Sequence, residues 1–464
     1  MTDGREGRTR LTRVLRRIEE YVRGLRLDAY LVGGAVRDEL LGLDSKDADF
    51  LVPGVDYAGL RAALAPHGNV QDLEVAGQLV GIRLYPRRRA VRALAPAGIE
   101  FAPPRAERST GPGRHDFEIV ADASISVDDD MARRDFTVNA MARRLETGEL
   151  VDPFGGQRDL ERRVLRTVSP RSFAEDPLRL VRGVRFVSQL DLDPDDVTLA
   201  QMREDAASVK LVSGERVGGG VHADGLGELS KLLLGTRPGK ALRLMRDTGV
   251  LVELLPEFEP TIGFRADGVR QLGPVDEHIF DVVQAAADAG ALLDVRLAAL
   301  LHDLGKPIAD LPAHADASAR LAAPILARLR YPTRLRRRVT AIVRHHAFRV
   351  DDVDDLFARR FLRRHGAEIA LDLVALKAAD LRAKAVEPHE LEGVERLRAL
   401  LERERESPYR LADLAVDGSD LLALGYRAGP ELGRALEELL EDVVVDPTLN
   451  TREFLLRRAE ELRA

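Results

Sequence analysis

The chain has 464 residues, of which 45% are hydrophobic and 32% charged, and its formal net charge is −7. This length predicts about two to four globular domains, and the negative charge argues against a uniformly basic protein that coats nucleic acid. The sequence contains no cysteine, which excludes disulfides and thiolate metal sites. It shows neither an apolar signal core at its start nor an apolar run of roughly 20 residues, so we expect a cytoplasmic protein without a membrane partner.

Residues 10–26 repeat apolar side chains with the period of an amphipathic helix. Residues 28–143 then alternate helices with short apolar strands, which we place at AYLVGG, DADFLV, VGIRLY, GIEFA and FEIVA. This alternation predicts an α/β unit with a mixed sheet. Between the last two strands, the polar and glycine-rich segment ERSTGPGRH predicts a mobile loop.

The segment LVGGAVRDELLGLDSKDADFLV carries the first group of candidate site residues: Gly33, Gly34, Arg37, Asp47 and Asp49. On a strand, Asp47 and Asp49 point to the same face, about 7 Å apart. Two carboxylates at this spacing suit divalent metals that bind a triphosphate. The glycines let backbone N–H groups approach phosphate oxygens because no Cβ intervenes. A lone pair of aspartates would more often be a polar strand face, but the flanking motifs favour the phosphate interpretation.

Two further segments supply candidates near this strand. Glu100, in GIEFAPPR, is a candidate third carboxylate that orients an attacking hydroxyl or accepts its proton; the alternative is an exposed strand glutamate. In ARRDFTVNAMA, Arg134 is able to clamp phosphate oxygens. Asp135 and Asn139 are four residues apart and share a face if the segment is helical. The alternative for Asn139 is a residue that caps a helix or braces a loop.

The segment EDPLR, residues 175–179, predicts recognition of a nucleotide base. An aspartate that accepts and an arginine that donates, three positions apart at Asp176 and Arg179, match the hydrogen-bonding edges of both cytosine and adenine. Uracil and guanine place an oxygen against the carboxylate, which leaves a buried acceptor unpaired at a cost of about 1–3 kcal/mol. Glu175 would steer Arg179. The alternative is that Asp176 only caps a helix that begins at Pro177, and the two roles are compatible.

From about residue 160 the pattern is helical to the end of the chain. Within this part, a His-Asp pair ends the apolar run RLAALLHDLGKP, with further histidines and an aspartate around it. Imidazole and carboxylate groups suit a transition metal or magnesium, which activates a bound water for phosphoester hydrolysis. The candidate metal ligands are His278, His302, Asp303, His314, His345, His346 and Asp380.

Three points stay open in this segment. The spacing does not decide whether His345 or His346 faces the metal. His314 is a candidate phosphate binder as well as a candidate ligand. A lone His-Asp pair before a glycine is most often a helix end with Gly305 as its C-cap, so the metal interpretation depends on the full set of ligands.

These motifs resemble those of the class II nucleotidyltransferases, which comprise the tRNA CCA-adding enzymes and related bacterial poly(A) polymerases. GGAVRD with DAD, and then RRDFTVNA, match the first two motifs of that family. VDPFGGQRDLERRVLR, EDPLR and SGERV are similar to the third, fourth and fifth motifs and follow in the same order. The segment around the His-Asp pair resembles the HD phosphohydrolases. The resemblance covers almost the whole chain.

The resemblance implies an α+β fold with a polymerase-beta-like nucleotidyltransferase head and mostly helical neck, body, HD and tail domains. It places the ribose of the nucleotide near Asp135 and Asn139. The implied domains are an N-terminal helix at 1–26, the head at 27–160, a neck and body with base recognition at 161–269, the HD domain at 270–405 and a tail at 406–464.

The function implied by the resemblance is template-independent addition of CCA to tRNA 3′ ends from CTP and ATP. The head would use Mg²⁺, and the HD domain would be a phosphatase or 2′,3′-cyclic phosphodiesterase with a divalent metal such as Ni²⁺, Mn²⁺ or Mg²⁺. The alternatives are a poly(A) polymerase, an enzyme that adds only CC or only A, and a non-catalytic RNA-binding protein with a relic fold. VAGQLVGIRLYP lacks the basic and aromatic stretch of poly(A) polymerases, and retained site residues argue against a relic. The sequence leaves the oligomeric state unknown. Local arginine clusters are candidates for RNA contact: Arg8, Arg10, Arg13, Arg16 and Arg17, and Arg334, Arg336, Arg337 and Arg338.

Overall fold

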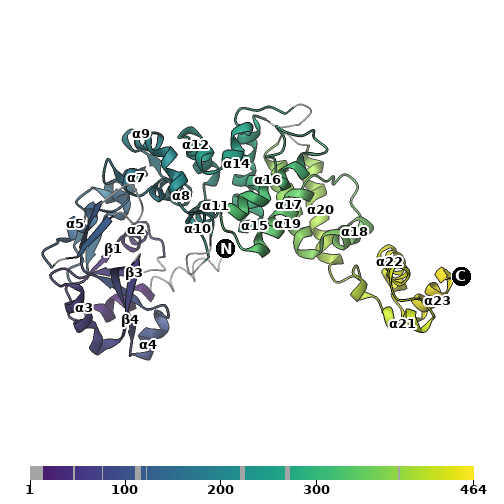
Figure 1. Ribbon diagram of the computed structural model, residues 1–464, viewed down its shortest axis with the longest axis horizontal. Helices are drawn as coiled ribbons and strands as arrows, with labels where there is room; N and C mark the ends of the chain where they lie inside the picture. The colour runs from purple at the N-terminus through teal and green to yellow at the C-terminus, as the bar shows by residue number, and fades with distance from the viewer. Residues whose placement is uncertain are drawn as a thin grey trace. The chain divides into compact units, whose positions relative to one another are not determined.

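The computed structural model describes residues 14–44, 48–75, 77–109, 117–121, 123–219, 225–266, 272–384 and 387–463. The chain forms two compact units, Met1–Val217 with Lys240–Leu254, and Gly218–Gly239 with Leu255–Ala464 (Figure 1). The segment 161–269, for which the sequence implies a single neck and body, contributes to both units. Among the described helices, none is long and apolar enough to cross a membrane.

The first unit contains the expected mixed sheet, with seven strands in the order β3-β4-β5-β2-β1-β8-β9. Its strands are β1 Tyr30–Val32, β2 Asp49–Leu51, β3 Gly68–Val75, β4 Gln78–Pro86, β5 Ile99–Ala102, β8 Ala142–Arg144 and β9 Leu150–Val151. Strand β2 pairs with β1 in antiparallel register and with β5 in parallel register. Phe50 of β2 and Phe101 of β5 are both buried, and their rings stack 5.5 Å apart. This packing buries one face of the two central strands.

A separate antiparallel pair, β6 Arg105–Ser109 and β7 Phe117–Ala121, follows the last of the expected central strands. The five strands predicted from apolar runs are present as β1, β2, β4, β5 and β7. Residues 110–116, which hold most of the predicted loop, lie outside the described residues.

The helices of the first unit surround this sheet and continue beyond it. A helix over residues 14–23 agrees with the amphipathic pattern near the start of the chain. The 239–255 segment forms two helices rather than one, because Gly249 adopts a φ of +84° between them. The others are α2 Gly34–Leu40, α3 Tyr57–Leu64, α4 Arg89–Leu94, α5 Val127–Ala132, α6 Gly156–Glu161, α7 Ser172–Glu175, α8 Leu178–Leu190, α9 Asp196–Asp205, α10 Gly214–Val217, α12 Pro238–Asp247 and α13 Val250–Leu254.

The described part of the second unit is helical. Its helices are α11 Glu228–Leu233, α14 Val275–Asp288, α15 Leu293–Leu301, α16 His314–Arg328, α17 Thr333–His345, α18 Asp355–His365, α19 Ala367–Arg382, α20 Pro388–Glu404, α21 Gly418–Ala423, α22 Pro430–Val445 and α23 Arg452–Arg463. The last three pack around a small core of their own that includes Leu421, Leu439 and Leu455. Gly425 and Gly429, predicted to mark helix ends, have positive φ values of 90° and 125°.

A close backbone approach joins the second and third motifs in the first unit. Gly156 opens α6, and a Cβ at this position would overlap the backbone oxygen of Thr137. The Gly156 N–H also donates to Asp152 Oδ1 at 2.7 Å. Only a residue without a side chain lets the two segments pack at this distance.

We therefore expect Gly156→Ala to lower the free energy of unfolding by about 1–3 kcal/mol, because the added methyl group overpacks a backbone contact. Calorimetric unfolding of the purified variant measures this loss. Gly433→Ala is the matched control: Gly433 lies on α22 with no atom near the position of its Cβ, so alanine there should be neutral or stabilising. Equal stability of the two variants would contradict the packing argument.

Candidate functional site

Asp49 and Glu100 lie side by side on the sheet of the first unit. They are register partners on the parallel strands β2 and β5. Because Phe50 and Phe101 point into the core, the two carboxylates point to the opposite face. Glu100 accepts hydrogen bonds from Arg83 Nε at 3.2 Å and Nη2 at 2.5 Å, and its side chain stays 42% exposed. Asp47, the other predicted metal ligand, lies outside the described residues.

The glycine turn before α2 has a conformation that requires glycine at its first position. Gly33 has a φ of 67° and a ψ of −127°, and a Cβ there would lie 2.5 Å from Arg134 Nη1. The Gly33 N–H donates to Met141 O at 3.1 Å, so this N–H is occupied by the backbone rather than presented to a phosphate. Gly34 opens α2. The turn therefore serves the close approach of an arginine as well as that of any ligand.

A continuous chain of hydrogen bonds links three motifs behind this turn. Arg37 Nη1 donates to Asn139 Oδ1 at 2.6 Å, and Asn139 Nδ2 donates to Asp135 Oδ1 at 3.0 Å. Arg182, on α8, donates to Asp135 Oδ2 through Nε at 2.8 Å and Nη2 at 2.7 Å. Arg37 also donates to Asp38 Oδ1 at 2.6 Å. The sequence reasoning missed Arg182, although its place one turn after Arg179 on an amphipathic helix was a usable signal.

The buried carboxyl group of Asp135 is ionised. Burial alone would raise the pKa of Asp135, but the Arg182 guanidinium and the hydrogen bond from Asn139 hold that pKa below its ordinary value. Asp135 and Asn139 come together across a short 3-10 helix, Thr137–Asn139, rather than along an α-helix. Asn139 thus braces the loop, as one alternative proposed, and does so through an aspartate of the same motif.

A second buried carboxylate, Asp130, positions the two arginines of this motif. It accepts from Arg133 Nε at 2.9 Å and Nη2 at 2.7 Å, and from Arg134 Nη2 at 3.1 Å. The backbone N–H of Arg105 also donates to it at 3.3 Å. Asp130 was not among the sequence candidates. Its spacing of three and four residues from two arginines on one helical face is the signal that could have found it.

The base-recognition residues of α7 and α8 are held by the surrounding chain. Arg179 donates to Ser172 Oγ at 3.0 Å and to the backbone oxygen of Arg133 at 2.7 Å. Glu175 lies 3.8 Å from Arg179, within reach to steer it. Asp176 Oδ1 accepts from the N–H of Leu178 at 3.1 Å, at the start of α8. The capping alternative for Asp176 is therefore present in the structure.

The other oxygen of the Asp176 carboxylate faces a residue of the fifth motif. Oδ2 lies 3.7 Å from Nη2 of Arg216, on α10. A capping bond to one oxygen leaves the second oxygen directed elsewhere, so capping and base reading do not exclude each other.

Arg182 and Arg185 form a matched pair of residues on α8. Both guanidinium groups lie over the ring of Phe186, at 5.7 and 4.3 Å from its centroid, but only Arg182 pairs with Asp135.

We expect Arg182→Ala to destabilise the protein by about 1–3 kcal/mol, because it leaves a buried acceptor without its donor, and to reduce nucleotide incorporation. Arg185→Ala should cost less in stability. Thermal unfolding and incorporation rates of both variants test this, and equal losses would show that ring stacking, not the Asp135 pair, is what matters.

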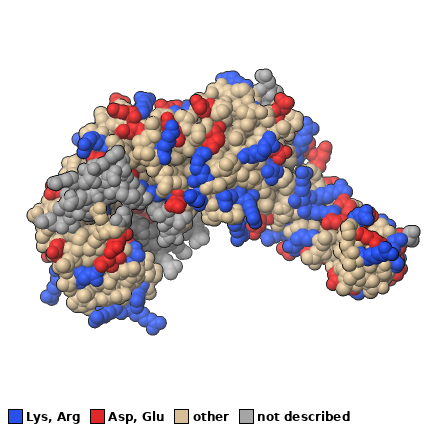
Figure 2. Space-filling model, in the orientation of Figure 1, with Lys and Arg blue, Asp and Glu red and all other residues tan. Residues whose placement is uncertain are grey.

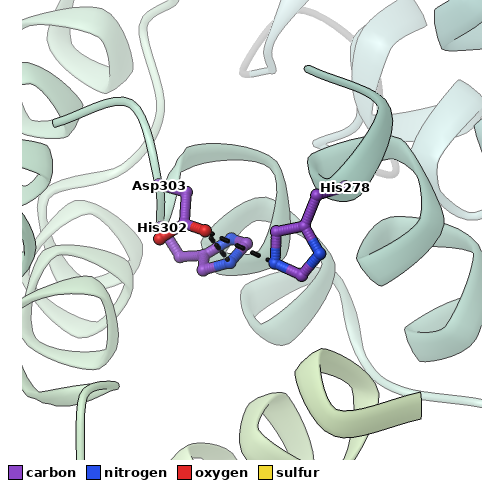
Figure 3. A group of neighbouring side chains, drawn as sticks. All are labelled: His278, His302 and Asp303. Atoms are coloured by element: carbon purple, nitrogen blue, oxygen red, sulfur yellow. Dashed lines mark ion pairs between the residues drawn. The ribbon is translucent and has the colours of Figure 1, made fainter. Parts of the chain in front are cut away.

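The second unit gathers a cluster of buried histidines and aspartates from four helices. His278 of α14, His302 at the end of α15 and Asp303 lie together (Figure 3). Asp303 Oδ2 is 3.1 Å from His302 Nε2 and 3.4 Å from His278 Nε2. Asp380 Oδ1, on α19, is 3.0 Å from His278 Nε2. All four side chains are at least nine-tenths buried.

His314 and His346 complete this cluster, and His345 does not join it. Asp303 Oδ1 is 3.5 Å from His314 Nε2 and 3.6 Å from His346 Nε2. The ring of His345 instead packs 4.9 Å from the ring of His365. Two groups among the described residues have the spacing of metal ligands, His278 with His302 and Asp303, and Asp303 with His314 and His346. The inclusion of His345 among the predicted ligands is thus not supported by its position.

The charge state of the cluster suits cation binding. Burial lowers the pKa of His302 to about 4, which leaves its imidazole neutral at neutral pH. Burial opposes ionisation of Asp303, but the neighbouring His302 and Lys306 hold the pKa of Asp303 well below its ordinary value. Lys306 Nζ lies 2.5 Å from Asp303 Oδ2, and Lys384 Nζ lies 2.6 Å from Asp380 Oδ1. Neither lysine was among the sequence candidates.

Gly305 has a different role from the helix cap that the sequence suggested as an alternative. Its φ is not in the left-handed region, and a Cβ would overlap the backbone of His314 and Ser318 on α16. The Gly305 N–H donates to Ser318 Oγ at 2.8 Å. The glycine therefore permits the close packing that brings His314 to the cluster.

The arginines of α17 do not form a uniformly basic face. Arg338 pairs with Asp294, Glu368 and Asp372 at 3.0, 2.9 and 2.6 Å. In the view of Figure 2, basic and acidic side chains alternate over the second unit. Arg8, Arg10 and Arg13 lie outside the described residues.

Comparison with known proteins places these sites in a family. The family model of the poly(A) polymerase head domain matches residues 29–166, that of the RNA and SrmB-binding site of polymerase A matches 191–262, and that of tRNA nucleotidyltransferase domain 2 matches 308–459. The multifunctional CCA protein of Leptothrix cholodnii is 36% identical over 436 residues, 90% of this chain and 96% of that protein. The multifunctional CCA protein of Xanthomonas campestris pv. campestris is 33% identical over 432 residues, 88% and 95% of the two chains.

Two solved structures share the fold. The Bacillus stearothermophilus CCA-adding enzyme, solved in complex with CTP, aligns with a TM-score of 0.70 and 25% identity over 96% of each chain. The Thermotoga maritima CCA-adding enzyme, complexed with tRNA, aligns with a TM-score of 0.57 and 21% identity over 97% and 95% of the two chains. The α+β fold expected from the motifs is thus confirmed. With relatives of 33–36% identity over nearly their full length, this chain belongs to the tRNA nucleotidyltransferase family and is a nucleotidyltransferase.

Proposed function

We propose that this protein adds CCA to the 3′ end of tRNA from CTP and ATP without a nucleic-acid template. The relatives named multifunctional CCA proteins support this function, as does the similarity to an enzyme solved with CTP. The observation that carries the proposal is the chain from Arg37 through Asn139 and Asp135 to Arg182. It connects the glycine turn to the base-recognition helix, so that phosphate and base are held in one rigid frame.

The carboxylates of the sheet would hold Mg²⁺. Asp47 and Asp49 are the proposed ligands, since carboxylate oxygens are the donors this ion prefers, and the exposed Asp49 lies beside Glu100. When bound, the metal offsets the charge of the triphosphate. The 3′-oxygen of the tRNA bonds to the α-phosphorus as the bond from that phosphorus to the bridging oxygen breaks and pyrophosphate leaves. Glu100 would orient the 3′-hydroxyl or accept its proton.

The remaining residues of the frame would bind the nucleotide. Asp176 would accept from the amino group of cytosine or adenine, and Arg179 would donate to the neighbouring ring acceptor. The bonds from Arg179 to Ser172 and to the backbone of Arg133 hold the guanidinium in place before a base arrives. The complete set of proposed nucleotide-binding residues is Gly33, Gly34, Arg37, Arg134, Asp135, Asn139, Glu175, Asp176 and Arg179.

One assay tests the proposal directly. Purified protein is incubated with tRNA transcripts that end before CCA, after C and after CC, with each labelled NTP alone and in pairs. We expect C, C and A to be added in that order, and Asp49→Ala to add nothing. Addition of CC alone, of A alone or of long adenosine tails would contradict the proposal and identify the activity as a different member of the family.

Base selection gives a sharper prediction. We expect Arg179→Ala to incorporate CTP and ATP more slowly and to lose much of its discrimination against UTP and GTP, because the donor that reads the base is gone. The loss of one good hydrogen bond corresponds to about 1–3 kcal/mol, roughly 5- to 150-fold in relative incorporation. Competition assays with paired NTPs measure the ratio. Unchanged base preference with lowered thermal stability would mean that Arg179 only braces Ser172 and Arg133.

We further propose that the second unit is an HD-type phosphohydrolase. The support comes from the buried cluster of His278, His302, Asp303 and Asp380. Several of its buried nitrogen and oxygen atoms lack a well-aligned hydrogen-bond partner among the described residues. A bound divalent metal, Ni²⁺, Mn²⁺ or Mg²⁺, would satisfy them and supply a hydroxide for phosphoester hydrolysis. The proposed substrates are phosphomonoesters or 2′,3′-cyclic phosphates at RNA ends.

We expect Asp303→Ala to abolish metal-dependent hydrolysis of these substrates and to leave CCA addition intact, because the proposed polymerising carboxylates lie in the other unit. Hydrolysis is measured with p-nitrophenyl phosphate and 2′,3′-cyclic AMP in the presence of each metal. His345→Ala is the control, since its ring packs on His365 outside the cluster. If wild-type protein hydrolyses neither substrate with any of the metals, the hydrolase proposal fails.

A further inference from the structure

The cluster in the second unit consists of two half-sites that share one carboxylate. We define the first half-site as His278, His302, Asp380 and Oδ2 of Asp303, and the second half-site as His314, His346 and Oδ1 of Asp303. The two oxygens of Asp303 therefore face different sets of ligands. A carboxylate in this position has the geometry to bridge two cations.

The second half-site has the dimensions of one face of a metal coordination shell. Its three ligand atoms are 3.2, 3.5 and 3.6 Å apart, for His314 Nε2 to His346 Nε2, His314 Nε2 to Asp303 Oδ1 and His346 Nε2 to Asp303 Oδ1. Tetrahedral ligands with bonds of about 2.1 Å lie roughly 3.4 Å from one another. The three atoms fit this triangle without rearrangement.

The tautomers of the histidines point the same way. Nδ1 of His314 bonds to Leu311 O, and Nδ1 of His346 bonds to Val343 O at 2.7 Å. A carbonyl oxygen only accepts, so each Nδ1 carries the proton and each neutral ring presents a lone pair at Nε2. His302 follows the same pattern through Ala299 O at 2.8 Å. Metal-binding histidines are typically oriented by this kind of backbone hydrogen bond.

Two lone pairs that face each other at 3.2 Å repel unless a cation lies between them. The repulsion between His314 and His346 is not relieved by Asp303 Oδ1, which is also an acceptor and has no well-aligned hydrogen-bond partner among the described residues. All three groups are buried, so bulk water does not solvate them. An apolar core would not place three acceptors together.

We infer that the second unit binds two divalent cations, one in each half-site, with Asp303 as the bridging ligand. This inference rests on the proposed phosphohydrolase site and specifies how many ions it holds. Imidazole with carboxylate is a ligand set for Mn²⁺, Co²⁺, Ni²⁺ or Zn²⁺. A pair of cations would hold a phosphate group from two sides, which assigns His314 and His346 to metal binding rather than to direct contact with phosphate.

The test counts ions in the full-length protein. Wild type, His346→Gln, His314→Gln and His345→Gln are dialysed against excess Mn²⁺, and the bound metal per chain is measured by elemental analysis. We expect His346→Gln and His314→Gln each to bind about one ion fewer than wild type, and His345→Gln to match wild type. The comparison cancels the ions bound by the head, because all four proteins share it. Circular dichroism confirms that each variant is folded, and either second half-site variant suffices if the other is not.

A second measurement reports on the bridge itself. Two Mn²⁺ ions joined by a carboxylate give an exchange-coupled electron paramagnetic resonance spectrum, which should be present in wild type and His345→Gln and absent in His346→Gln. Equal metal content in wild type and both second half-site variants, with no coupled spectrum, would overturn the inference. Hydrolysis by a protein with a single ion in the cluster would leave the proposed hydrolase standing without the second ion. Two coupled ions without hydrolysis would do the reverse.

Discussion

Buried carboxylates that keep their charge are the constraint around which both units are arranged. An ionised carboxylate removed from water costs several kcal/mol unless cations and hydrogen-bond donors surround it. In the first unit Asp130 and Asp135 are buried in this way, and in the second unit Asp303 and Asp380 are. Each collects cationic or polar partners, and these partners are the groups proposed to act on nucleotides and phosphates.

In the first unit, compensation of these charges assembles the site from distant parts of the chain. The bond from Arg182 to Asp135 joins residues 47 positions apart, and the bond from Arg37 to Asn139 joins residues 102 positions apart. Neither pair forms until the sheet and α8 have packed, so charge compensation and site assembly are one event. The Phe186 ring stacks against Arg37 and Arg182, which orders both guanidinium groups from the side opposite their polar contacts.

In the second unit, the ligands come from helix ends rather than from helix faces. His302 and His346 follow the last residues of α15 and α17, and His314 is the first residue of α16. Side chains at these positions converge on one point when the helices pack at their ends. Gly305 allows α16 to approach Asp303 at backbone distance. Histidines that bond their own backbone through Nδ1 then direct Nε2 inward.

The sequence by itself determined the fold class, the order of the motifs and most members of the buried cluster, because periodicity and residue type are local properties. Tertiary structure decided the pairings. It placed Glu100 beside Asp49 by parallel strand register, chose His346 over His345 by the turn of α17, and brought Arg182 to Asp135. Such contacts depend on which faces of distant elements meet. That is set by packing of the whole unit and is not encoded in spacing along the chain.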